Sequence, residues 1–352
     1  MLPAGLRARL EQLYPGATIE RVTALADDET SGESMKALGY GRPLRVELAH
    51  GDAHHTLVFH TARPDDFGHD RRADRVANLV LAYDTFGKLP NHSRALDVGL
   101  VRDDGQLISL ANTGEPYLLT TWCEGTLYAD ELRRVAAAGV ASDQDLAHAQ
   151  RLAELLLEIH AAPGSHAGAY TRAIRDLLGH GEGIFGLVDS YPASELTPRL
   201  RVIEEACLEW RWKLRERTDR LRRTHGDCHP FNIVIGEDVC LLDASRGSEG
   251  DPADDVACLT INYLFFGAGD PKHAGGLLAL WDRFWQTYLA GDRVDVLAGV
   301  APFYAWRALV LASPIWYPHI SAAERDRILA FAERALAADR FDPAWGAEAL
   351  AG

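Results

Sequence analysis

The residue pattern changes near position 120, and this change limits the folds that the chain can adopt. Before it, short runs of β-branched and aromatic residues alternate with turn-forming residues. Such runs are typical of strands, and we predict strands within residues 17–25, 43–62 and 115–122. The turn His50-Gly51-Asp52 would make the second run a hairpin. The first third of the chain therefore predicts a small sheet.

One helix is predicted beside this sheet, within residues 65–87. Its apolar residues recur at the three- and four-residue spacing of a helix, and Gly87 can end it. These apolar residues are Val76, Leu79, Val80 and Tyr83.

After residue 125 the pattern is mainly helical. Ser142 can cap a helix at residues 143–161, whose leucines and isoleucine form one apolar stripe. Residues 232–236 and 239–243 predict a strand pair joined by a turn. Further helices are predicted near residues 194–222, 254–266, 272–290, 301–312 and 321–338. A small β-rich lobe followed by a large helical lobe indicates a bilobal nucleotide-binding fold of the α+β class.

The length and charge of the chain narrow the choice of partners. The 352 residues favour two domains or lobes, and the formal charge is −15. Binding to nucleic acid or to an anionic membrane needs clustered Lys and Arg, so neither is expected. The N-terminus has no apolar signal segment. Residues 299–318 are apolar but carry Arg307 and three prolines, which favours a buried helix ending near Ser313 over a membrane span.

The cysteines show no pattern of a disulfide or metal framework. They form no Cys-x-x-Cys pair and no even, closely spaced set, which predicts reduced thiols in a cytoplasmic protein. The five are Cys123, Cys207, Cys228, Cys240 and Cys258.

Residues 224–243 contain more polar and ionisable side chains than a strand pair requires. Asp227 precedes Asn232 by five positions, and Asp243 closes the second strand. Phosphoryl transfer needs a carboxylate that accepts or orients the acceptor hydroxyl, and oxygen ligands for Mg²⁺. Because a hairpin returns the chain to its start, these three side chains can meet at one point. The alternative is a polar turn before a core strand, with the carboxylates capping helices.

This segment resembles the aminoglycoside phosphotransferase and choline kinase superfamily, which shares the protein-kinase fold. The resemblance is carried by the runs HGDCHPFNI, LLDASRG and GDPADDVA. It implies that Asp227 is the catalytic residue and that Asn232 and Asp243 bind Mg²⁺. It also implies that His225 braces the loop and that Asp255 bonds to the loop backbone.

The resemblance extends to the organisation of the whole chain. It implies a bilobal protein-kinase-like α+β fold, with a nucleotide-binding lobe at residues 1–121. Residues 122–352 would form the helical lobe with the catalytic loop and the acceptor site. The run LLTTWCEG is similar to the strand that joins the lobes, where backbone groups of Thr121, Trp122 and Cys123 would receive the adenine.

The sequence departs from the family at the phosphate-binding cation. The family places a Lys on the third strand and pairs it with a Glu on the next helix. Here the Lys position falls on or beside His60, and the helix offers Asp74, or Asp70, in place of the Glu. Lys36, at the start of the second strand, is the nearest replacement cation, so we expect Lys36, His60 and Asp74 to contact the nucleotide. The alternatives are a core histidine and a solvated lysine.

The acceptor is the least defined part of the expectation. Residues 181–186, GEGIFG, follow a helical stretch, so they predict a flexible loop near the acceptor rather than a phosphate loop. Glu182 and Asp189, with tryptophans nearby, suit an amino-sugar or quaternary-ammonium acceptor, although tryptophans in helices are more often core residues.

Together these features predict a small-molecule kinase that needs Mg²⁺. It would transfer the γ-phosphate of ATP, or of GTP as the alternative donor, to a hydroxyl of an amino sugar, aminoglycoside or choline-like compound. A different hypothesis is a catalytically silent kinase-like module that binds a ligand or partner. The missing strand Lys favours this second hypothesis.

Overall fold

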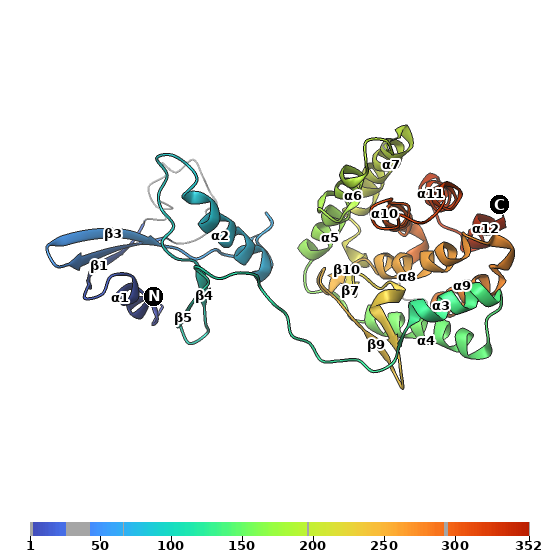
Figure 1. Ribbon diagram of the computed structural model, residues 1–352, viewed down its shortest axis with the longest axis horizontal. Coiled ribbons are helices and arrows are strands. Elements are labelled where there is room, and N and C mark those ends of the chain that lie inside the picture. The colour runs from blue at the N-terminus through green and yellow to red at the C-terminus, as the bar shows by residue number, and fades with distance from the viewer. Residues whose placement is uncertain (1–2, 26–42, 66, 196, 292–294, 352) are drawn as a thin grey trace. The chain divides into compact units, whose positions relative to one another are not determined.

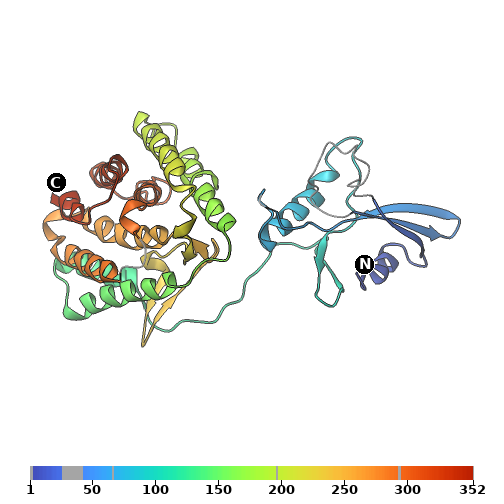
Figure 2. The ribbon, with the colours of Figure 1, turned by 180° about the vertical axis from the view of Figure 1, so that it is seen from behind.

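The computed structural model describes residues 3–25, 43–65, 67–195, 197–291 and 295–351. The chain divides into two compact units, Met1–Leu119 and Thr120–Gly352, and each is considered by itself (Figures 1 and 2). The described part of the first unit contains five strands and two helices, and helices dominate that of the second. The expected α+β class is confirmed.

The first unit is built on a three-stranded antiparallel sheet in the order β1-β2-β3. Leu6 and Leu10 of the N-terminal helix are buried against Val46 and Leu48 of the sheet, which makes a small core. The elements of this unit are α1 (Leu6–Leu13), β1 (Thr18–Ala24), β2 (Leu44–His50), β3 (Ala53–Phe59), α2 (Arg72–Phe86), β4 (Gly99–Val101) and β5 (Leu107–Ser109).

The hairpin and the helix predicted for this unit are confirmed. β2 and β3 are joined at Gly51, whose φ of 60° is a left-handed value that favours glycine. The helix α2 ends just before Gly87. The strand predicted at residues 115–122 is wrong, because this segment lies outside every strand of the described residues. A strand needs neighbours for its backbone groups, and no described strand pairs with this segment.

The second unit is a set of helices packed around α8 (Pro252–Gly267) and α10 (Ala301–Leu311), whose residues are mostly buried. α4 (Asp143–His160) packs on α9 (Gly275–Ala290), and α10 packs on α11 (Ala322–Ala337). The remaining α-helices of its described residues are α3 (Tyr128–Ala138), α5 (Ala167–Gly179), α6 (Ile184–Ser190), α7 (Pro198–Leu214) and α12 (Trp345–Ala351).

The helices predicted for this unit are confirmed at positions that correspond to α4 and α7 to α11. Ser142 caps α4 as expected, because its hydroxyl accepts the N–H of Asp145 at 3.3 Å. The flexible loop expected at residues 181–186 is partly wrong. Ile184 begins α6 within that segment and is fully buried.

Two small sheets hold the polar segment at residues 224–243. It begins after β7 and passes through the hairpin of β8 and β9, which is the strand pair predicted from the sequence. β8 also pairs with β6, and β7 pairs with β10. These strands are β6 (Thr126–Leu127), β7 (Arg222–Arg223), β8 (Ile233–Ile235), β9 (Val239–Leu241) and β10 (Glu249–Gly250).

A buried ion pair fixes the start of α8. Arg220 Nε and Nη2 donate to the two carboxylate oxygens of Asp251 at 2.7 and 2.8 Å. The Tyr170 hydroxyl donates to the same carboxylate at 2.9 Å, and Asp251 accepts the N–H of Ala253 at 3.0 Å. Removing one partner of a buried pair leaves an uncompensated charge, at a cost of roughly 3–5 kcal/mol. The first turn of α8 is therefore held in place, and it lies next to the polar segment at residues 224–243.

Cys123 and Cys240 form a disulfide, which corrects the expectation of five reduced thiols. Their Cα atoms are 6.3 Å apart, although 117 positions separate them in the sequence. β6 and β9 both pair with β8, one on each side of it, and the disulfide joins the segment before β6 to β9. The spacing of the cysteines gives no sign of this proximity. Cys207, Cys228 and Cys258 are free and buried.

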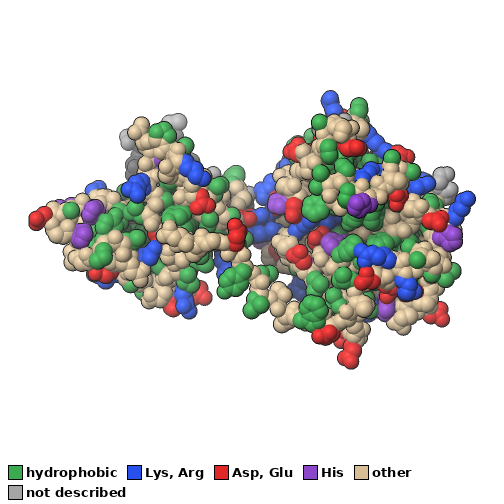
Figure 3. Space-filling view, viewed as in Figure 1, with side chains coloured by type: hydrophobic (Ala, Val, Ile, Leu, Met, Phe, Trp, Pro, Cys, Tyr) green, Lys and Arg blue, Asp and Glu red, His purple; other side chains and the backbone are tan. Residues whose placement is uncertain are grey.

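The apolar stretch at residues 299–318 contains α10, which ends at Leu311, close to the predicted end. Among the described residues, no helix combines the length and apolarity that crossing a membrane requires. Acidic and basic side chains are interspersed on the face of the second unit shown in Figure 3. Ion pairs also link α7 to α11, where Arg199 binds Glu333 and Asp326, each at 2.6 Å.

Candidate active site

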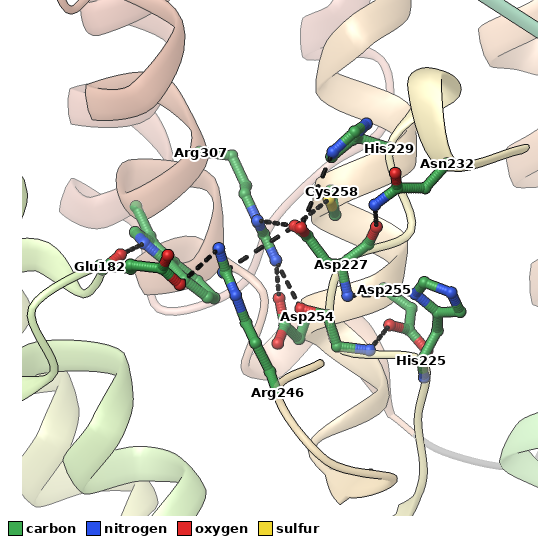
Figure 4. Close-up of polar contacts among 12 residues, drawn as sticks. Glu182, His225, Asp227, His229, Asn232, Arg246, Asp254, Asp255, Cys258 and Arg307 are labelled. Atoms are coloured by element: carbon green, nitrogen blue, oxygen red, sulfur yellow. Dashed lines mark hydrogen bonds and ion pairs between the residues drawn. The ribbon is translucent and has the colours of Figure 1, made fainter. Parts of the chain in front are cut away.

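The Asp255 side chain holds the backbone of the polar loop that precedes β8. Its Oδ2 accepts the N–H of His225 at 2.8 Å, and its Oδ1 accepts the N–H of Gly226 at 2.7 Å (Figure 4). Gly226 has a φ of 82°, a left-handed value at which a side chain would be strained. These bonds tie the loop to the first turn of α8.

Asp255 is also bonded to His160 at the end of α4. His160 Nε2 lies 3.0 Å from Asp255 Oδ2, and its Nδ1 lies 2.8 Å from the hydroxyl of Tyr288 in α9. Burial acts to raise the pKa of Asp255, but the hydrogen bonds from His160, His225 and Gly226 hold it below the usual carboxyl value. Three helices thus meet at one buried carboxylate that supports the loop.

Asp227 lies in this loop with its two carboxylate oxygens in different surroundings. Oδ1 is 2.7 Å from Arg307 Nη1, 3.8 Å from Arg246 Nη1 and 3.9 Å from Cys258 Sγ. Oδ2 is 3.7 Å from His229 Nε2. Burial acts to raise the pKa of Asp227, but the charges of Arg307, Arg246 and His229 lower it below the usual value. Asp227 is therefore ionised at neutral pH and can accept a hydrogen bond from a hydroxyl.

Arg307 joins this carboxylate to a second one. Its Nη2 donates to Asp254 Oδ1 at 2.7 Å and to the carbonyl oxygen of Gly226 at 3.0 Å. Burial raises the pKa of Asp254 to about 6, although the charge of Arg307 acts in the opposite direction. The guanidinium carbon of Arg307 lies 3.9 Å from the centre of the Trp306 ring.

The two residues expected to bind Mg²⁺ are adjacent across the β8–β9 hairpin. The side-chain Nδ2 of Asn232 donates to the carbonyl oxygen of Asp227 at 3.1 Å, so its Oδ1 is the atom able to bind a cation. The N–H of Leu242 donates to the carbonyl oxygen of Asn232 at 2.8 Å, which places Asp243 next to it. Asp243 is exposed and has a φ of 55°. A carboxylate and an amide oxygen beside an open face fit a hard cation that retains water ligands.

The residues expected to contact the nucleotide are divided between the two units. His60 is exposed and follows the end of β3, so the alternative of a core histidine is wrong. Asp74 accepts the N–H of Arg71 at 2.8 Å and thereby caps α2. Lys36 lies outside the described residues.

The segment that was expected to contact adenine belongs to the second unit. Thr121, Trp122 and Cys123 lie in irregular backbone before β6, and the thiol of Cys123 is taken by the disulfide. The Cys123 thiol is therefore not available to a nucleotide.

Of the two carboxylates expected at the acceptor, only Glu182 is joined to the cluster around Asp227. Its Oε2 lies 3.3 Å from Arg246 Nη2, and its backbone carbonyl accepts the Trp306 Nε1–H at 2.7 Å. Asp189 is exposed at the other end of α6, where its charge acts on Glu204 of α7. The structure therefore brings Glu182, and not Asp189, into the described contacts of the site.

Sequence reasoning did not identify the charged groups that surround Asp227. These residues are Arg246, Asp254 and Arg307. One signal was present, because Arg307 interrupts an otherwise apolar stretch. A buried arginine needs carboxylate or carbonyl partners, so its position indicated a polar cluster under α10.

A family model agrees with this arrangement of a polar loop, a hairpin and a helix. The model of the phosphotransferase enzyme family (APH) matches residues 45–294 of the chain. The chain belongs to this family. The resemblance inferred from the loop motifs is confirmed, and the protein is a member of a phosphotransferase enzyme family.

Comparisons with individual proteins add less about this phosphotransferase. No curated protein matches it. A solved glucosamine kinase matches with a TM-score of 0.42 and 18% identity, over 96% of this chain and 97% of that one. A spectinomycin phosphotransferase solved with ADP and spectinomycin has a TM-score of 0.32 and 10% identity, over 98% and 96% of the two chains. A choline kinase from Cryptosporidium parvum has a TM-score of 0.20 and 10% identity, over 94% and 87%. These scores are low, so the family assignment rests on the family model.

Proposed function

We propose that this phosphotransferase transfers the γ-phosphate of ATP to a hydroxyl of a small molecule in a reaction that depends on Mg²⁺. Asp227 would be the catalytic residue, and Asn232 and Asp243 would hold the metal. The observation that carries the proposal is the bond from Asn232 Nδ2 to the Asp227 carbonyl oxygen, 3.1 Å long. This bond ties the Asn232 side chain to the backbone of Asp227, which supports a metal ligand and a catalytic carboxylate at the two ends of one short loop.

In the proposed reaction, Asp227 accepts a hydrogen bond from the acceptor hydroxyl and aims its oxygen at the γ-phosphorus. A new oxygen–phosphorus bond forms while the bond between the γ-phosphorus and the β-γ bridging oxygen breaks, and ADP leaves. The hydroxyl proton passes to the Asp227 carboxylate and then to solvent. A Mg²⁺ ion bound at Asn232 and Asp243 would supply positive charge to the phosphate oxygens.

The candidate nucleotide contacts are those that the family pattern indicates. We retain His60, Asp74 and the backbone of residues 121–123 as candidate contacts, with Lys36 as the candidate cation. ATP is the proposed donor, with GTP as the alternative. Magnesium at Asn232 and Asp243 would offset part of the triphosphate charge in a protein whose formal charge is −15.

Glu182 is the proposed acceptor carboxylate, because it is joined through Arg246 to Asp227. Its side chain is 58% exposed, so it can still bind an amino group or a hydroxyl of the acceptor. Asp189 has no comparable support and is set aside.

An acceptor screen tests the proposal. Phosphate transfer from labelled ATP would be measured with glucosamine, spectinomycin, choline and glucose, which represent amino-sugar, aminocyclitol, quaternary-ammonium and uncharged acceptors. On an acceptor that the wild type uses, Asp227→Asn should lower kcat by about 10²- to 10⁴-fold. The matched control is Asp339→Asn, because the Asp339 side chain is 99% exposed.

Two results would contradict this assignment. Undiminished turnover of Asp227→Asn would remove Asp227 from the reaction. A wild type that gains no thermal stability from ATP, with or without Mg²⁺, would favour the silent binding module, since a bound nucleotide stabilises the folded state by mass action.

A further inference from the structure

Arg307 is buried, and its guanidinium contacts two carboxylates, a carbonyl oxygen and an aromatic ring. Its side chain is 6% exposed, and Nη1 and Nη2 together contact Asp227, Asp254 and the carbonyl oxygen of Gly226 at 2.7, 2.7 and 3.0 Å (Figure 4). The ring of Trp306 covers one face of the guanidinium, at 3.9 Å from its central carbon. A planar group with contacts on two nitrogens and one face has little freedom to rotate.

These contacts fall on one oxygen of Asp227. Oδ1 faces Arg307 at 2.7 Å and Arg246 at 3.8 Å. The contact of Oδ2 with His229 Nε2 is 3.7 Å, which is longer than a hydrogen bond. His229 Nδ1 accepts the N–H of Phe231 at 3.2 Å, so a neutral His229 carries its proton on Nε2, facing Oδ2. Among the contacts of the described residues, Oδ2 is thus the Asp227 oxygen that has no hydrogen bond.

Asp254 balances the charge of Arg307. Its side chain is 16% exposed and shares the Arg307 guanidinium with Asp227. If Asp227 were the only carboxylate bound to Arg307, the guanidinium would compete more strongly with the acceptor hydroxyl for that carboxylate. With two carboxylates on one fork, the position of Asp227 is fixed while its second oxygen remains available.

We propose that Arg307 is a positioning residue, which fixes the Asp227 carboxylate through Oδ1 and leaves Oδ2 to accept the hydroxyl proton, with Asp254 as its counter-charge. This inference rests on the proposed function of Asp227. Arg307 touches neither ATP nor the acceptor in this scheme and acts through Asp227. Its loss should therefore lower kcat much more than it raises KM.

A second arginine provides a matched control. Arg199 also binds two carboxylates, Glu333 and Asp326, each at 2.6 Å, but it does so between α7 and α11. Its side chain is 28% exposed. Arg199→Met removes a two-carboxylate arginine from the same unit without touching the polar loop.

The experiment compares Arg307→Met, Arg307→Lys, Asp254→Asn and Arg199→Met in the full-length protein. Initial rates would be measured for an acceptor found in the screen and for slow ATP hydrolysis, in which water is the acceptor. A displacement of about 1 Å at a reacting group can cost ~10²-fold. We expect Arg307→Met to lose about that factor in kcat for both reactions, with less than ~3-fold change in KM. Arg307→Lys should recover part of kcat, because it keeps the charge but not the fork.

Asp254→Asn covers the case in which Arg307→Met does not fold, because it keeps the shape of the site. We expect its kcat to fall while the thermal shift given by ATP with Mg²⁺ is retained. Arg199→Met should keep the wild-type kcat even if its melting temperature falls.

A double-mutant cycle distinguishes a loss of Asp227 positioning from a general loss of stability as the cause of the lower kcat of Arg307→Met. In an Asp227→Asn background, Arg307→Met should cost less than ~3-fold in kcat, because the carboxylate that Arg307 positions is already gone. An equal loss in both backgrounds would overturn the positioning role.

The remaining outcomes tell the two proposals apart. If the wild type is active and Asp227→Asn is impaired, but folded Arg307→Met and Asp254→Asn keep kcat within ~2-fold, only the positioning proposal fails. If the wild type supports neither phosphate transfer nor ATP hydrolysis, both proposals fail.

Discussion

His160 Nε2 and Asp255 Oδ2 lie 3.0 Å apart, and neither side chain is more than 1% exposed. This pair links the end of α4 to the first turn of α8 and supports the loop that contains Asp227. We predict that Asp255→Asn will lower the free energy of unfolding by roughly 1–3 kcal/mol for each donor left unsatisfied, because the buried Asp255 carboxylate accepts bonds from His160, His225 and Gly226. Urea titration followed by circular dichroism would measure the change.

The control for this prediction is an aspartate at the surface. Asp326→Asn removes an exposed partner of Arg199, whose other partner, Glu333, remains. Surface changes of this kind stay within about 0.5 kcal/mol. If the two variants lose the same stability, the buried pair is not what supports the loop.

Acid should remove the contribution of Asp255 to stability. Its pKa is lowered in the folded protein relative to the ordinary value of 3.8, so its contribution is fully present above that value. The contribution is lost as the pH falls through the folded pKa. The urea midpoints of the wild type and Asp255→Asn should therefore converge below about pH 4. A difference that stays constant down to pH 3 would contradict this assignment.

Thiol titration should detect the disulfide and the buried cysteines together. Without reductant, the native protein should react slowly with a thiol reagent, because its three free cysteines are buried. Denaturation should expose those three thiols, and reduction should expose all five. Cys240→Ser, which removes the bond, should lower the free energy of unfolding by up to ~4.7 kcal/mol in the chain-entropy estimate. Five reactive thiols in the unreduced, denatured protein would show that the bond does not form.

Magnesium binding should depend on the carboxylate that follows β9. We predict that Asp243→Asn will weaken Mg²⁺ binding about tenfold, measured as the Mg²⁺ concentration that gives half of the extra thermal shift seen with ATP and Mg²⁺. The thermal shift with ATP alone should change little. The control is Asp238→Asn, which changes an exposed residue at the turn of the same hairpin. Equal Mg²⁺ dependence in the two variants would place the metal elsewhere.

Local patterns predicted much of the fold. The hairpin of β2 and β3, the cap of α4 at Ser142 and the strand pair around the turn before Val239 each depend on residues close in the sequence. The strand expected at residues 115–122 failed for the opposite reason. Its β-forming residues satisfy the local pattern, but a strand also needs a partner, and this cannot be read from the segment itself.

In the candidate site, too, the contacts between residues close in the sequence were predicted and those between distant residues were not. The spacing of Asp227, Asn232 and Asp243 is local, because one loop and one hairpin join them. Arg307 reaches Asp227 from 80 positions away, and the disulfide joins residues 117 positions apart. Such contacts depend on how helices and strands pack. The sequence offered only the indirect sign of a charged residue in an apolar helix.

The origin of Arg307 in α10 also has a consequence for the order in which the protein can mature during synthesis. The loop with Asp227 leaves the ribosome before the helix that supplies its cation. Until α10 is made, Asp227 and Asp254 have no Arg307 to bind, and the nascent chain cannot adopt the arrangement of Figure 4. A chain that stops before residue 301 would end with the loop, the hairpin and α8 complete in sequence but without this cation. The capacity to position a hydroxyl would then appear only once α10 has folded against the rest of the second unit.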